Sequence, residues 1–93
     1  MTREEVLIEA YELDTATSAG EYGDAHEMHV RIAAMWSAIL GYPVASWQVA
    51  LMMAALKLAR LAHAPQHRDS WVDAAAYAAI GAELAAADRG ASR

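Results

Sequence analysis

The alternation of apolar and polar positions along the chain predicts helices throughout. Apolar residues recur at intervals of three and four, which is the helical period, in four stretches separated by segments rich in glycine, proline and hydroxyl residues. The predicted helices cover about residues 3–14, 24–41, 47–63 and 69–88. We therefore expect an all-α fold, an antiparallel bundle of about four helices.

Capping signals mark the ends of the first two predicted helices. Thr2 and Glu5 have the spacing of a capping box, and Asp24 is placed to cap the second helix. Gly41 follows the last apolar position of that helix and is expected to end it. The segment 15–23 between them contains two glycines and several hydroxyl residues, so it is predicted to be a long loop.

The third predicted helix is apolar on nearly every face, the pattern of a helix surrounded by others. Ser46 is expected to cap it, and Asp69 or Ser70 to cap the fourth. We therefore expect the third helix to be innermost. It carries few polar residues, namely Gln48, Lys57, Arg60 and His63.

Length and composition favour one small domain that associates with itself. With 93 residues, the chain is expected to form a single domain over 1–88, followed by a frayed tail over 89–93. The hydrophobic fraction is 57% and there are 3 tryptophans, more than so small a fold can hide. A homo-oligomer is the expected consequence.

Charge and apolar run length exclude several classes of protein. The chain has no cysteine, which rules out disulfides and thiolate metal sites. A net charge of −5 with only 7 basic residues argues against binding to a nucleic-acid duplex. No apolar run reaches the roughly 20 residues that span a bilayer, and the acidic N-terminus does not resemble an export signal. A cytoplasmic protein with no membrane partner is expected.

One charged cluster could carry chemistry. Lys57 and Arg60 project from the apolar third helix, so they need carboxylates, solvent or a bound anion, and Asp69 and Asp73 are the obvious partners. One interpretation is an ion-pair network that joins the third and fourth helices. The other is a cleft in which the basic groups bind phosphate and the two aspartates hold Mg²⁺.

The histidines are less informative. His26 and His29 stand three positions apart on the second helix without a further metal-binding signature, so we interpret them as surface or cleft residues. His67 lies close to Asp69 in sequence and is the histidine best placed to meet a ligand.

Three segments together support a family resemblance: Glu-Tyr-Gly-Asp at 21–24, the Lys57-x-x-Arg60 pair, and His-Arg-Asp-Ser-Trp-Val-Asp-Ala-Ala-Ala-Tyr at 67–77. Over most of its length the chain resembles a family of small, phage-encoded proteins of uncharacterised function. That family is similar to nucleotide-modification-associated domains and, more remotely, to the all-helical MazG-like nucleotide pyrophosphatases. The resemblance implies a nucleotide pocket lined by Lys57, Arg60, His67, Asp69 and Asp73, with Tyr22, Glu27 and Arg31 near its rim.

The carboxylate pattern departs from that of the pyrophosphatases. Those enzymes hold magnesium with an ExxE pair and an ExxD pair, whereas here Asp69 and Asp73 are one residue further apart and Glu27 stands alone on its helix. The preferred hypothesis is therefore a nucleotide-binding protein that need not be an enzyme and that sequesters a nucleotide metabolite or signalling nucleotide. One alternative is a Mg²⁺-dependent nucleoside triphosphate pyrophosphohydrolase with Asp69 and Asp73 as metal ligands. The other is a helical interaction module with no ligand.

Overall fold

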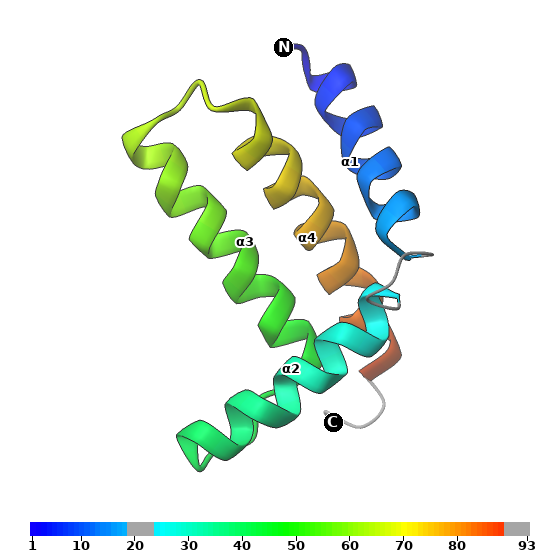
Figure 1. Ribbon diagram of the computed structural model, residues 1–93, viewed down its shortest axis with the longest axis vertical. Coiled ribbons are helices and arrows are strands. Elements are labelled where there is room, and N and C mark those ends of the chain that lie inside the picture. The colour runs from blue at the N-terminus through cyan, green and yellow to red at the C-terminus, as the bar shows by residue number, and fades with distance from the viewer. Residues whose placement is uncertain (19–23, 89–93) are drawn as a thin grey trace.

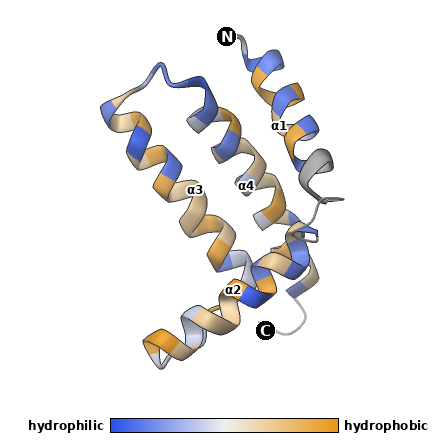
Figure 2. Cartoon of the chain, in the orientation of Figure 1, coloured by the Kyte–Doolittle hydropathy of each residue, from blue (hydrophilic) through white to orange (hydrophobic). Residues whose placement is uncertain are grey.

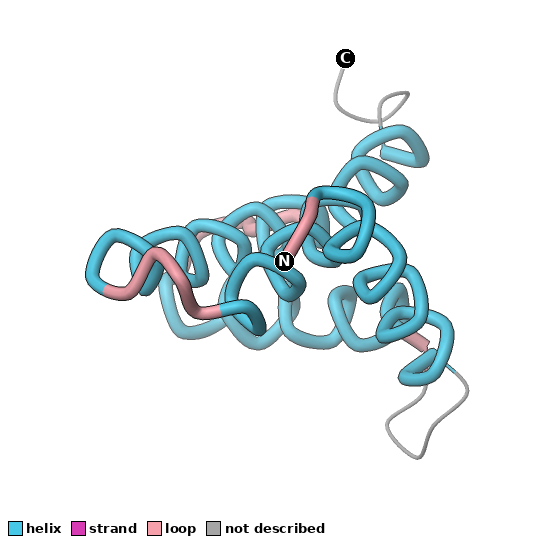
Figure 3. Tube along the Cα trace, turned by 90° about the horizontal axis from the view of Figure 1, so that it is seen from above, coloured by secondary structure: helices cyan, strands magenta, loops and turns pink. Residues whose placement is uncertain are grey.

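The computed structural model describes residues 1–18 and 24–88, most of which lie in helices (Figures 1 and 3). No strand occurs in these two stretches. The all-α prediction is confirmed for them. The helices are α1 (Arg3–Ser18), α2 (Ala25–Leu40), α3 (Ser46–His63) and α4 (Arg68–Asp88).

The middle position belongs to α4. It packs along α3 on one side and α1 on the other, while α2 crosses the lower part of this layer (Figure 1). α3 runs antiparallel to α4, but α1 runs parallel to it, so the antiparallel prediction holds for the α3–α4 pair and is wrong for α1. The expectation that α3 is innermost is also wrong, because the buried residues of α3 lie on one face: Val49, Ala50, Ala54 and Leu61.

α3 and α4 make the most extensive helix–helix contact in the described chain. Gly81 makes it possible, because a Cβ added there would lie 3.2 Å from the Cβ of Ala50. At the far end of the pair, the indole Nε1 of Trp47 donates a hydrogen bond of 3.2 Å to Asp88 Oδ2. Small residues therefore bring the two helix backbones together, and a polar contact fixes their register.

A small apolar cluster joins α1 to α4. Ala10 of α1 is buried against Val72 and Ala76 of α4, and Val6 and Ala75 pack around them. Burial of apolar area contributes about 25 cal/mol per Å². Because two members are alanines, this contact contributes less stability than a leucine-rich interface would.

The local capping predictions for α1 and α2 are confirmed. Thr2 N–H donates to Glu5 Oε1 at 2.7 Å, and Glu5 N–H donates to Thr2 Oγ1 at 3.1 Å, which completes the capping box. Asp24 Oδ1 accepts from Glu27 N–H at 2.8 Å. Gly41 ends α2 with φ of 68°, a left-handed conformation that glycine adopts without strain.

Two boundaries differ from prediction. α1 continues to Ser18, so the predicted loop over 15–23 begins later, and its residues 19–23 lie outside the described part. Ser46 is the first residue of α3 rather than its cap. Ala45 is the N-cap residue, and its N–H donates to the side chain of Gln48 at 2.8 Å. The Gln48 side chain therefore satisfies the N–H of the N-cap residue, while no side chain among the described residues accepts a hydrogen bond from the first turn of α3.

Figure 2 shows hydrophobic residues along α2 and α3. Many of their large apolar side chains are exposed, among them Ile39, Leu40 and Leu51. Since α3 buries only the side that faces α4 and α2, its other side is open to solvent. Even so, none of the described helices combines the length and apolar character needed to cross a membrane.

Candidate functional site

Lys57 and Asp73 meet at the α3–α4 seam. Lys57 Nζ lies 3.1 Å from Asp73 Oδ2, with 17% and 28% of the two side chains exposed. Each residue faces the seam because the helical period places it beside a buried alanine or valine of its own helix. The pair therefore offsets much of the cost of withdrawing each charge from water.

Arg60 lies one helical turn beyond Lys57 and is exposed. Among the residues that the structure describes, it has no ion-pair partner. Asp69, the carboxylate expected to pair with it, is exposed in the first turn of α4. The predicted four-residue network is thus reduced to one ion pair, with a free guanidinium close to it.

His67 caps α4, a role that the sequence had suggested for Asp69 or Ser70. Its Nδ1 accepts the Ser70 N–H at 3.3 Å and lies 2.8 Å from Ser70 Oγ, which is buried. A ring nitrogen that accepts is unprotonated, so in the neutral imidazole the proton is assigned to Nε2. His67 therefore presents Nε2–H as a donor beside the start of α4.

Arg68 and Glu9 form an ion pair that sequence reasoning missed. Arg68 Nε and Nη2 lie 2.7 and 2.6 Å from Glu9 Oε2. This hydrogen-bonded contact with Glu9 raises the pKa of the Arg68 guanidinium. Since the partners are far apart in the sequence, no local spacing could have revealed the pair.

The predicted rim residues do not join the seam. His29 of α2 is turned toward α4, with its ring centroid 6.0 Å from that of Tyr77. Glu27 and Arg31 each stand two positions from His29, on the opposite, exposed side of α2. Tyr22 lies outside the described residues. The structure therefore brings together Lys57 and Asp73 and leaves the rim as a prediction.

His29 itself is buried, with 4% of its surface exposed, rather than lying at the surface or in a cleft as the sequence had indicated. Its Nδ1 is 2.7 Å from the carbonyl oxygen of Ala25, so Nδ1 carries the proton that is donated. In the described part of the chain, Nε2 has no hydrogen-bond partner. The aromatic ring thus anchors α2 to α4 by packing with Tyr77.

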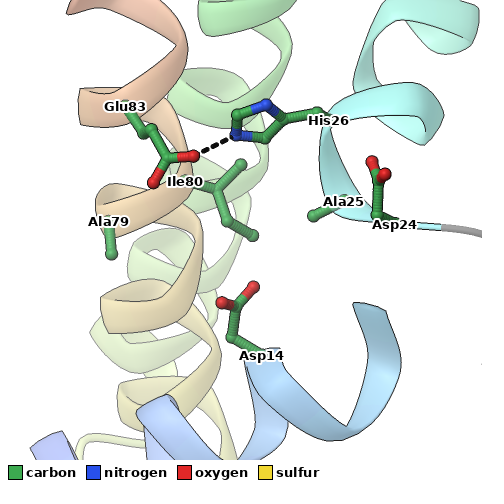
Figure 4. A pocket seen from close by; sticks show the side chains of 7 residues that line it. All are labelled: Asp14, Asp24, Ala25, His26, Ala79, Ile80 and Glu83. Atoms are coloured by element: carbon green, nitrogen blue, oxygen red, sulfur yellow. Dashed lines mark ion pairs between the residues drawn. The ribbon is translucent and has the colours of Figure 1, made fainter. Parts of the chain in front are cut away.

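A cavity of about 350 Å³ lies away from the seam, between α1, α2 and α4 (Figure 4). On its wall, His26 Nε2 and Glu83 Oε1 are 2.6 Å apart. Sequence reasoning missed this contact, which joins two helices that are distant along the chain. Among the described residues, no group of three or more histidine or acidic side chains could hold a metal ion. The lining residues are Asp14, Asp24, Ala25, His26, Ala79, Ile80 and Glu83.

Comparison with known proteins assigns the chain to a family. Residues 5–85, which span all four helices, match a family described as Domain of unknown function (DUF6378). The chain belongs to this family. The DUF6378 match contains the Lys57–Asp73 seam, Arg60 and His67.

A phage protein is among the relatives of this DUF6378 chain. The Gene 55 protein of Mycobacterium phage L5 is 41% identical over 76 residues, which cover 81% of this chain and 49% of the phage protein. The chain thus spans about half the length of that curated relative. No solved structure matches the chain at a significant level. The expected resemblance to phage proteins of uncharacterised function is confirmed, whereas the nucleotide-modification and MazG-like resemblance stays a prediction.

Proposed function

We propose that this DUF6378-family protein binds a phosphate-bearing nucleotide at the end of the α3–α4 hairpin. The observation that carries the proposal is the exposed Arg60 guanidinium, which has no carboxylate partner among the described residues and lies one turn from Lys57. In a chain with 12 acidic and 7 basic residues, a cation left unpaired in this way favours an anion from outside.

Three groups at this end of the molecule suit a phosphate. Arg60 offers a planar fork that matches two phosphate oxygens, and Lys57 supplies a point charge whose position Asp73 fixes. His67 adds the Nε2–H donor assigned above, beside the positive end of the α4 dipole. Preorganised donors lose little conformational freedom on binding, which improves affinity.

The proposal covers binding and does not extend to hydrolysis. A magnesium-dependent pyrophosphatase needs several carboxylates around one site, and Asp73 is already engaged with Lys57 while Asp69 is exposed. A role for Asp69 and Asp73 in holding Mg²⁺ on a bound nucleotide stays part of the prediction, as do Glu27, Arg31 and Tyr22 at the rim. The setting that we propose is the cytoplasm of an infected host, where nucleotides are abundant.

A second candidate is a helical interaction module in which the charged residues only fix packing. The direct contact of Lys57 with Asp73 favours it, because a pair that satisfies itself needs no ligand. The two candidates differ in what Arg60 does. In the interaction module Arg60 has no ligand, so removal of its exposed side chain changes neither ligand binding nor the stability of the fold.

The test is a thermal-shift and calorimetric screen of the parent protein with nucleoside triphosphates, diphosphates and cyclic nucleotides, with and without Mg²⁺. A ligand at a hundredfold its dissociation constant stabilises the folded state by about 2.7 kcal/mol. We expect Arg60→Ala to lower affinity about tenfold or more, the loss of one charge-assisted contact, while the melting temperature stays unchanged.

Arg3→Ala is the matched control, because Arg3 is also exposed but lies at the start of α1. This variant should bind as the parent does. Absence of binding by the parent protein would sink the nucleotide proposal and leave the interaction module.

A further inference from the structure

The middle of α3 presents an apolar surface on the side that faces away from α4. From Leu51 to Ala59, every exposed residue of α3 is apolar. Exposed Arg60 and His63 lie beyond this stretch, in the last turn of α3. We call the exposed apolar side of α3 the outer stripe. Its residues are Leu51, Met52, Ala55, Leu56, Leu58, Ala59 and Ala62.

The outer stripe has the spacing of a helix–helix seam. Leu51, Ala55, Leu58 and Ala62 follow one another at intervals of four, three and four, the heptad repeat of helices that pack along their length. Leucine and alanine alternate along this line. A seam of this kind alternates bulky knobs with gaps that admit a neighbouring backbone closely.

We infer that a second copy of this chain docks on the outer stripe, with the two α3 helices antiparallel across a two-fold axis. In the register centred between Leu56 and Lys57, Leu51 packs against Ala62 of the partner subunit, and Ala55 packs against the partner's Leu58. A large residue then meets a small one at every level of the seam. This self-complementarity is what an isologous interface requires.

The antiparallel direction follows from charge and size. In a parallel pair, leucine would face leucine and alanine would face alanine, so the alanine levels would be left underpacked. The basic end of α3, with Arg60 and His63, would also lie beside its own copy. Antiparallel packing separates the two basic ends and opposes the two helix dipoles favourably.

The outer stripe offers well-exposed apolar side chains: Leu51, Leu56 and Leu58 are 60%, 47% and 53% exposed. Burial of such surface against a second copy is the favourable term in association. The inference concerns the face of α3 opposite the seam with α4, so it is independent of the nucleotide proposal.

The first test compares two single charges on matched leucines. Leu51 in the outer stripe is 60% exposed and Leu7 on α1 is 63% exposed, so glutamate is tolerated by the fold at either position. We expect the parent to sediment as a dimer and Leu51→Glu to weaken dimerisation roughly a hundredfold, since the two-fold axis introduces the charge twice. Leu7→Glu should remain dimeric, and circular dichroism should be the same for all three.

A monomeric parent, a dimeric Leu51→Glu or a monomeric Leu7→Glu would each overturn the inference.

The register is tested by complementation. Ala62→Lys should dissociate by itself, but an equimolar mixture with Leu51→Glu should form a heterodimer, because the new lysine faces the new glutamate. If both variants remain monomeric in the mixture, the proposed pairing is overturned.

Discussion

The helix cap of α4 is a histidine, because Nδ1 of His67 accepts the Ser70 N–H in the first turn. Aspartate and serine are the common helix caps, so Asp69 or Ser70 was expected in that role. The caps at Thr2, Asp24 and Gly41 were predictable because each depends on residues within four positions. His67 follows the same geometry with an uncommon acceptor, which preference tables rank low.

The capping box of α1 makes a prediction about pH. The pKa of Glu5 is held below its ordinary value of 4.5, first by the Thr2 N–H and then by the Thr2 hydroxyl and the positive N-terminus. Because the folded pKa is the lower one, the ionised carboxylate stabilises the helix start above about pH 4.5. This contribution is lost as the pH falls through the folded value.

We expect an NMR titration to place the Glu5 carboxyl below 4.5, and Thr2→Ala to move its pKa upward by removing the hydroxyl contact. Glu4→Gln, a change at the exposed neighbour, should leave the Glu5 titration where it was. A Glu5 pKa at or above 4.5 in the parent would contradict the capping-box assignment.

At the scale of elements, the sequence predicts helices well and predicts their contacts poorly. Every predicted helix exists, since apolar periodicity and caps are local signals. The contacts that position them join distant residues, as in Arg68 with Glu9 and His26 with Glu83. Of these contacts, the sequence allowed only Lys57–Asp73 to be predicted, because two charges on neighbouring helices must find partners.

The Lys57–Asp73 pair should couple measurably in a double-mutant cycle. Lys57→Met alone strands a half-buried carboxylate and Asp73→Ala alone strands an ammonium, so each single change should destabilise the fold. The double variant should be more stable than the sum of the single effects predicts. Partial exposure screens the pair, so we expect a coupling of about 1–2 kcal/mol in denaturant unfolding.

Lys57→Met with Asp69→Ala is the matched cycle, because Asp69 is exposed and makes no ion pair within the described residues. That cycle should show no coupling. Equal coupling in both would mean that a diffuse field, rather than the 3.1 Å contact, holds the helices together.

At the scale of the whole molecule, one pattern was misinterpreted for a physical reason. A helix that is apolar all round can be surrounded by its own chain or can face another chain, and periodicity does not distinguish these cases. α3 was expected to be innermost, yet α4 lies in the middle and α3 exposes its outer stripe. Alanine is the reason, since the alanine-rich α4 admits neighbours closely on several sides while contributing little apolar signal.

The parallel placement of α1 beside α4 has a consequence for the order of folding and opening. α3 and α4 are joined by a short turn, so their contacts are local, whereas Ala10 must find Ala76 near the other end of the chain. A small alanine-rich cluster and the exposed Glu9–Arg68 pair then hold α1 in place. Amide hydrogen exchange should therefore show α1 opening as a separate, less protected unit while the α3–α4 hairpin stays closed. Equal protection of both would show a single cooperative unit instead. A detachable α1 would uncover the start of α4 without unfolding the hairpin that bears Arg60 and Lys57.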